Sequence, residues 1–195
     1  MSRKLSLVDI SDHRAYANER EAFRADVIAV KKRRRIGVGP FVTFLFENRD
    51  TMRFQIQEMA RVERIDSDEG IETELRAYNP LIPEPGELKA TMFLELTTDE
   101  LLREWIPKLA NIERSVSLRI ADDSVPLLLD SDHEKQLTRE DMTSAVHYLG
   151  ASLSTSQVAE FATGGAILEI THPEYRHSEA LSAEMTTELL LDLRP

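Results

Sequence analysis

Carboxylate, amide and guanidinium side chains gather in residues 46–65, where they have the types needed for acid–base or metal chemistry. Glu47 and Glu58 are spaced so that an unbroken helix would place both carboxylates on one face. Paired carboxylates can serve as general acid and base, or as oxygen ligands of a metal ion. The candidate catalytic residues are Glu47, Asn48, Arg49, Gln55, Glu58, Arg61 and Glu63.

The same carboxylates also have a structural interpretation, which we favour. Glu58 and Arg61 are three residues apart, the spacing of an ion pair on a helix. Structural ion networks perturb carboxylates much as active sites do, so the clustering alone does not identify an enzyme. The arginines expected to pair with the acids are Arg49, Arg53, Arg61 and Arg64.

The histidines give a weaker indication of a metal site. His172 and His177 flank Glu174 directly after the last expected strand. With Glu58 and Glu63 they are the candidate metal ligands, although a polar turn after a strand is the simpler interpretation. No cofactor is predicted, and a metal is kept as the alternative.

Composition excludes several classes of function. The chain contains no cysteine, which excludes disulfides, thiolate catalysis and cysteine-bound iron–sulfur clusters. Its net charge of −11 disfavours general binding to nucleic acid or to an anionic membrane. No Walker loop, GxSxG or HExxH motif is present. The first residues lack the apolar run of a signal peptide, so we expect a cytoplasmic protein.

The segment 46–65 is expected to be a helix that is apolar on two sides and therefore sandwiched. At 100° per residue, Met52, Ile56 and Met59 share one face and Glu63 continues it, so Glu63 needs a partner, a proton or a metal. The opposite face carries Phe54, Glu58, Arg61 and Ile65. The remaining stripe, assigned to solvent or a partner, carries Arg53, Gln57, Ala60 and Arg64.

Residues 1–80 are predicted to form a helical N-terminal part. A first helix, capped by Asp9 or Ser11, should end in the basic run 31–35, where cations complement the helix dipole. An anion site or acidic-partner site is the alternative for that run. Residues 41–47 fit either a strand or a helix, and 68–78 should form an acidic helix.

Residues 81–195 are predicted to form an α+β part after a boundary rich in proline at 79–86. Strand, capped helix and strand occur twice, with alternating strands at 90–96, 116–120, 145–153 and 166–170. This order, βαββαβ, matches a ferredoxin-like antiparallel sheet, with an edge strand near 125–129 and a C-terminal helix at 182–193. The two parts form either two domains or one compact unit.

The segment 39–65, Tyr78–Pro83 and the run His172–His177 together resemble an uncharacterised bacterial family, domain of unknown function 3501 (DUF3501). The resemblance spans nearly the whole chain and implies no established activity. Members are often encoded near rubrerythrin-like and iron–sulfur proteins, which implies a redox or oxidative-stress setting by association. We therefore expect an accessory or binding protein that self-associates or docks to a protein partner. A metal- or carboxylate-dependent enzyme with its site in residues 47–63 is the alternative.

Overall fold

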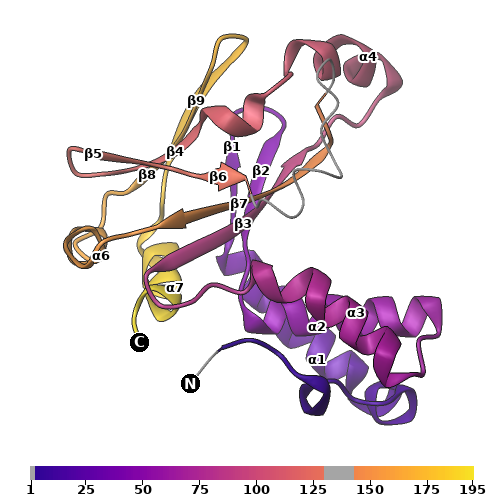
Figure 1. The fold of residues 1–195 in the computed structure, drawn as a ribbon. Helices are drawn as coiled ribbons and strands as arrows, with labels where there is room; N and C mark the ends of the chain where they lie inside the picture. Colours follow the sequence, from indigo (N-terminus) through magenta and orange to yellow (C-terminus); the bar gives the residue numbers. More distant parts are fainter. Residues whose placement is uncertain (1–2, 130–142) are drawn as a thin grey trace.

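The computed structural model describes residues 3–129 and 143–195, which form two antiparallel sheets and a group of helices (Figure 1). The helices are α1 (His13–Arg33), α2 (Arg49–Glu63), α3 (Asp68–Tyr78), α4 (Asp99–Lys108), α6 (Thr155–Phe161) and α7 (Ala183–Leu193). Short 3-10 turns are η1 (Leu7–Asp9), η2 (Asn79–Leu81) and η3 (Ile112–Ser115). Within this described part, no helix is both long enough and apolar enough to cross a bilayer.

The strands divide into two sheets. They are β1 (Arg35–Val38), β2 (Val42–Phe46), β3 (Glu87–Leu94), β4 (Val116–Ile120), β5 (Asp123–Pro126), β6 (Leu128–Leu129), β7 (Val146–Ser152), β8 (Ile167–His172) and β9 (Tyr175–Ala180). The first sheet has the order β1-β2-β3-β7-β6 and the second β5-β4-β8-β9. Strands from both sides of residue 80 therefore share the first sheet.

The main hydrophobic core contains side chains from both sheets. Phe44, Met92 and Leu149 of the first sheet and Leu118 and Leu168 of the second are fully buried in it. Because side chains alternate along a strand, the neighbours of the first three residues point to the other face of the first sheet. That outer face is the one available to the N-terminal helices.

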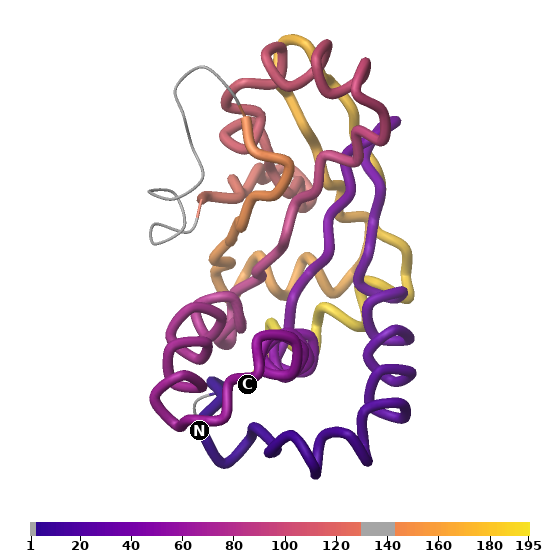
Figure 2. Tube along the Cα trace, turned by 90° about the vertical axis from the view of Figure 1, so that its right-hand side faces the viewer, coloured from indigo at the N-terminus to yellow at the C-terminus, as the bar shows by residue number. Residues whose placement is uncertain are grey.

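The N-terminal helices gather at one end of the first sheet. Figure 2 shows β2 and β3 running between the end where α4 lies and the end where α2 and α3 lie. A small second core, with Ile56 and Leu81 fully buried, joins α2 and η2, and Tyr148 of β7 packs against it. The helices therefore cover only part of the outer sheet face.

The ferredoxin-like topology is not confirmed, because the four predicted strands lie in two sheets. Strand β3 pairs antiparallel with β7, and β4 pairs antiparallel with β8. In a ferredoxin-like fold all four strands share one antiparallel sheet, whereas here β3 and β7 belong to the first sheet and β4 and β8 to the second. The alternation of apolar and polar residues predicts each strand and its buried face, but it does not predict which strand pairs with it. Here the partner on the free side of β3 is β2.

Several local predictions are confirmed. Strand β4 and helix α3 have the predicted bounds, and Ser154 and Gln157 form the predicted capping box of α6. Helix α7 ends at Leu193 as predicted and begins at Ala183, one residue later than predicted. The segment near 125–129 supplies an edge strand to each sheet, β5 and β6. The first helix, however, is capped by Asp12 rather than by Asp9 or Ser11.

The open choice for residues 41–47 resolves as a strand. Val42–Phe46 is buried at every position and pairs with β1 and β3. Helix α2 therefore starts later than predicted, at Arg49, with Asn48 as its N-cap. The Asn48 side chain accepts a hydrogen bond from Thr51 N, and Thr51 Oγ1 accepts one from Asn48 N. This box fixes the turn that carries Glu47.

Arg34, inside the basic run, forms a buried clasp to α7. Its Nε donates to Phe46 O at 2.8 Å and its Nη2 to Glu47 O at 3.1 Å. The same guanidinium pairs with Asp192 and, at 3.4 Å, with Glu188. Arg34 is one of the largest fully buried side chains, so its charge depends on these groups for compensation. Arg34 is thus not available to an external anion.

A second clasp joins the two sheets at the β1–β2 turn. The hydroxyl of Tyr175, buried on β9, donates to Val38 O at 2.8 Å and accepts from the backbone N of Phe41 and Val42 at 3.3 Å. Gly39 turns the chain there with φ +77°, a left-handed conformation that favours glycine. The tyrosine thereby ties the backbone of this tight turn to the second sheet.

Candidate functional site

Glu47 lies just beyond β2, where its carboxyl group is buried at the junction of the first sheet and α2. It is 4% exposed. Its Oε2 accepts from Thr51 Oγ1 at 2.6 Å and its Oε1 accepts from Thr91 Oγ1 at 2.6 Å. Burial raises the pKa of Glu47, and this outweighs the opposing hydroxyl hydrogen bonds and the charges of Lys31 and Arg34.

The hydroxyl of Thr51 allows Glu47 to exist in either protonation state. Besides donating to Glu47, Thr51 Oγ1 lies 3.1 Å from Asn48 O, a second acceptor. When Glu47 carries a proton and donates it to Thr51, the hydroxyl can turn its own hydrogen to Asn48 O. Neither state then leaves a buried donor unsatisfied, which is the usual cost of a buried polar group.

Glu47 lines a cavity of about 250 Å³ on the outer face of the first sheet. The strand register places Thr91 between Leu45 on β2 and Tyr148 on β7, and Arg35 of β1 beyond Leu45. These four therefore form one row across the sheet. The other lining residues are Lys31, Met52, Gln55, Tyr78, Leu81, Phe93 and Val146.

Two tyrosines join Glu47 in this cavity. Burial raises the pKa of Tyr148, and the nearby Tyr78 and Glu47 raise it further. Gln55 Nε2 lies 3.5 Å from the Tyr78 hydroxyl, at the long limit of a hydrogen bond. Glu47, Gln55, Tyr78 and Tyr148 therefore bring four groups able to exchange hydrogen bonds to one partly buried space.

Glu58, a second candidate, lies away from this cavity in an ion network with α1. Arg20 makes a two-pronged contact with its carboxylate, Nε to Oε1 at 2.8 Å and Nη2 to Oε2 at 3.0 Å. The Tyr16 hydroxyl donates to Oε1 at 2.8 Å, and Arg61 Nη2 to Oε2 at 3.0 Å. Arg20 and these other donors lower the pKa of Glu58 to about 2. The predicted Glu58–Arg61 pair is thus present within a structural network.

We expect Glu58→Gln to destabilise the protein by about 2 kcal/mol at pH 7, because it removes the charge that Arg20 and Arg61 surround. The folded pKa lies below the ordinary value of 4.5. This stabilisation is therefore complete above pH 4.5 and is lost as the pH falls towards 2. Urea unfolding at several pH values should show the difference from wild type shrinking over that range.

Glu63→Gln is the matched control, since Glu63 lies exposed near the end of the same helix. We expect its effect to stay within about 0.5 kcal/mol. Equal losses in the two variants at pH 7 would contradict the structural role of Glu58.

The remaining candidates of the segment do not converge on Glu47. Asn48 is occupied as the helix cap, and Arg49 pairs with Asp9. Glu63 is exposed, so the prediction that it sits among apolar side chains and needs a partner was wrong. Of the predicted set, Gln55 alone lines the Glu47 cavity with it.

Gln57 and Ala60 belong to the stripe that was assigned to solvent or a partner, but another segment of this chain covers them. Both are buried, because the chain before α1 crosses this side of α2. Gln57 Oε1 accepts from Ser11 N at 2.7 Å, and Gln57 Nε2 donates to Ser11 O at 3.1 Å. Gln57 therefore supplies backbone hydrogen bonds to an irregular segment, a contact that helical periodicity does not reveal.

The histidines also have structural contacts. His172 Nε2 lies 3.1 Å from Ala110 O, and its Nδ1 accepts from Glu174 N at 3.3 Å. His177 packs against Tyr175, with ring centroids 4.5 Å apart. Among residues 3–129 and 143–195, no three His, Asp or Glu side chains are grouped as metal ligands would be. Glu58, Glu63, His172 and His177 thus do not form one centre.

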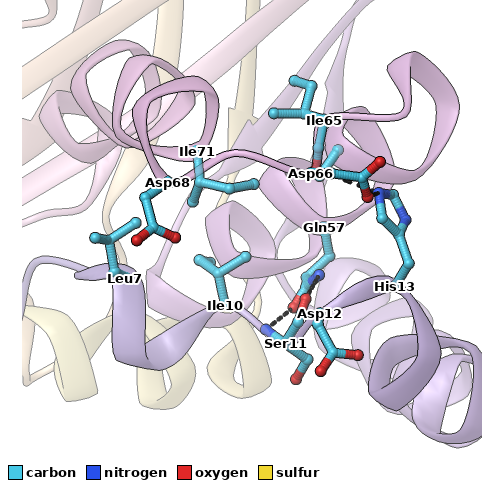
Figure 3. Close-up of a pocket in the computed structure, with 11 residues that line it drawn as sticks. Leu7, Ile10, Ser11, Asp12, His13, Gln57, Ile65, Asp66, Asp68 and Ile71 are labelled. Carbon is cyan, nitrogen blue, oxygen red and sulfur yellow. Dashed lines mark hydrogen bonds and ion pairs between the residues drawn. The ribbon is translucent and has the colours of Figure 1, made fainter.

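A smaller cavity, of about 140 Å³, lies between the chain before α1 and the α2–α3 connection (Figure 3). Its rim carries Asp12, Asp66 and Asp68, and His13 Nε2 contacts Asp66 Oδ1 at 2.9 Å. Asp12 is the cap of α1 and Gln57 is held by Ser11, so its best-placed polar groups already have structural roles. We therefore place the candidate site at the larger cavity.

Sequence reasoning missed most partners of Glu47. Thr91 and Tyr148 lie in strands, and their type alone does not mark them as site residues. Alternation was the available signal, since it places both on the face opposite Met92 and His147. Lys31 was predicted only as part of the basic run, where helix-dipole complementarity explained it.

Comparisons with known proteins give a family but no activity. The model of the family described as Protein of unknown function (DUF3501) matches residues 4–193. A crystal structure described as a novel protein of unknown function from Burkholderia pseudomallei K96243 is similar over 97% of this chain and 99% of that chain, with 34% identity and a TM-score of 0.90. No curated protein matches the chain.

Proposed function

The chain belongs to the DUF3501 family, which is described as being of unknown function, so we propose a function from the site alone: the protein binds a small molecule in the Glu47 cavity. The observation that carries this proposal is the buried, hydrogen-bonded Glu47 carboxyl at the wall of a cavity. A buried ionisable group is costly, and strongly perturbed groups in cavities are more frequent at functional sites.

The composition of the cavity wall supports this proposal. Leu45, Met52 and Phe93 supply apolar surface, while Glu47 and the two tyrosines supply a few hydrogen-bonding groups at one end. Ligand sites typically combine apolar walls with a small number of placed polar groups. A volume of about 250 Å³ suits a metabolite-sized molecule rather than a nucleotide or peptide.

Filling the cavity tests the proposal. Val146, half-buried at the cavity wall, is replaced by Phe, and Val62, exposed on α2, is replaced by Phe as the matched control. A mixture of small neutral, cationic and anionic molecules is screened by saturation-transfer NMR. We expect wild type and Val62→Phe to bind the same molecules and Val146→Phe to lose at least tenfold in affinity. Absence of binding to wild type, or binding that survives in Val146→Phe, would overturn the proposal.

Acid–base catalysis on the bound molecule is a second candidate, favoured by the raised pKa of Glu47 next to Tyr148. A carboxyl group whose pKa is raised by burial is better suited to act as a general base than an ordinary surface carboxylate. The NMR samples prepared in D₂O test this: Glu47→Gln should retain binding and lose exchange of the ligand's C–H protons. Exchange at the wild-type rate in Glu47→Gln would exclude Glu47 as the base.

Two further proposals rest on the sequence. Self-association or docking to a protein partner rests on the uneven charge of the sequence, which is +1 over residues 1–80 and −12 over residues 81–195. The redox or oxidative-stress setting rests on the family resemblance. Light scattering and affinity capture of the purified protein test the first. An inert monomer that captures no partner would count against it.

A further inference from the structure

We infer that the Glu47 cavity takes a small organic anion whose charge pairs with Lys31, an inference that rests on the binding function proposed above. Among the described residues that line the cavity, the charged ones are Lys31, Arg35 and Glu47. Two cations thus face one carboxyl group in a protein whose net charge is −11. The cavity wall is opposite in sign to the molecule as a whole.

Lys31 is the cation best placed to meet an anion. It lies half-buried in the last turn of α1, and the ion pairs among the described residues do not include it. Its Nζ lies 5.4 Å from the centre of the Phe54 ring, a contact that leaves ammonium hydrogens available. It is also close enough to Glu47 to lower the pKa of that carboxyl group. An anion bound beside Lys31 would therefore reach the inner polar end of the cavity.

Arg35 is a weaker candidate for direct contact with the anion because its guanidinium already interacts with other side chains. Its Nη1 lies 3.3 Å from Glu95 Oε1, and its guanidinium lies 5.2 Å from the centre of the Phe93 ring. Both members of that ion pair are largely exposed, so the pair itself contributes little. Arg35 therefore adds positive potential at the β1 side of the cavity, while Lys31 supplies the direct contact.

The uncharged groups define the rest of the ligand. Phe93, Leu45 and Val146 supply apolar surface from the sheet, and Tyr148 stands at the opposite end of the row from Arg35, with Tyr78 near it. The ligand class that satisfies both ends is a monoanion with an apolar body and a group that hydrogen-bonds to tyrosine or Glu47. Carboxylates are the simplest chemical members of that class.

Titration calorimetry with paired probes tests the inference. The probes are monocarboxylates from acetate to benzoate, each paired with its neutral amide, at constant ionic strength so that general screening does not differ. We expect at least one carboxylate to bind at least tenfold more tightly than its amide. Lys31→Gln should weaken that carboxylate about tenfold and leave its amide unchanged, the loss expected for one charge-assisted hydrogen bond.

Lys32→Gln is the matched control, because Lys32 is the adjacent residue, carries the same charge and is exposed. It should leave carboxylate affinity unchanged, and equal effects of the two variants would overturn the inference. If amides bind as tightly as carboxylates, and Val146→Phe abolishes their binding, the ligand is not selected for its negative charge. That result would overturn the inference of an anion and would leave the proposed binding function standing. Absence of binding by either kind of probe would overturn both.

Discussion

Arg34→Met is expected to cost about 3–5 kcal/mol of unfolding free energy, the range for breaking a buried ion pair by removing one partner. Methionine fills much of the space, but it leaves the Asp192 carboxylate buried beside an apolar side chain. It also removes the donors to Phe46 O and Glu47 O. Burial already raises the pKa of Asp192, and Arg34 is the main group opposing that shift. Urea unfolding followed by circular dichroism measures the loss.

Arg35→Met is the matched control, since Arg35 is the next residue and its guanidinium makes an exposed ion pair with Glu95 and a contact with the Phe93 ring. Its expected cost is about 0–1 kcal/mol. If Arg34→Met does not fold, Arg34→Lys keeps the charge but loses the planar guanidinium. It should fold, with a melting temperature below that of the wild type. The double variant Arg34→Met, Asp192→Leu should recover part of the loss. A cost for Arg34→Met no larger than that for Arg35→Met would contradict the clasp.

Gly39→Ala is expected to cost about 2–4 kcal/mol, because it combines backbone strain with a steric clash. Gly39 has φ +77°, and a Cβ there would lie 2.5 Å from the Tyr175 hydroxyl oxygen and 2.6 Å from Cγ of His177. The hydroxyl cannot retreat without giving up its bonds to Val38 O and Val42 N. Thermal and urea unfolding measure the total effect.

Gly164→Ala separates the two contributions. Gly164 has a similar φ of +87°, but nothing lies within 4 Å of the position that its Cβ would take. Its expected cost is therefore the strain alone, about 1–2 kcal/mol. Equal costs at the two glycines would show that Tyr175 and His177 yield to the methyl group, contrary to the expectation.

Local features of the fold were predictable because their causes are local. The Ser154–Gln157 capping box and the alternation of residues 116–120 each depend on neighbours within a few positions. The choice of sheet was not predictable in this way. Strand β3 lies between β2 and β7, which come from opposite sides of it in the chain, and no repeat of strand, helix and strand encodes that choice.

The candidate site was predictable in part, through Glu47 and Gln55. The spacing argument that joined Glu47 to Glu58 failed because Glu47 precedes α2 instead of lying within it. Glu58 instead points to α1, where Arg20, thirty-eight residues earlier, meets it. The role of a side chain in this protein depends on which distant element packs against its face of the helix. Helical periodicity predicts that a face is buried, but it does not identify the element that buries it.

The two clasps have a consequence for the order in which this protein can form during synthesis. The acids that compensate Arg34 lie at 188 and 192, and the hydroxyl that fastens the β1–β2 turn belongs to Tyr175. Until those residues have left the ribosome, the strand Val42–Phe46 lacks the tyrosine that fastens its turn, and Arg34 lacks the two acids that compensate its charge. Contacts between such distant residues slow folding and expose apolar strands to association in the meantime. We therefore expect this strand to gain its native protection only late in synthesis.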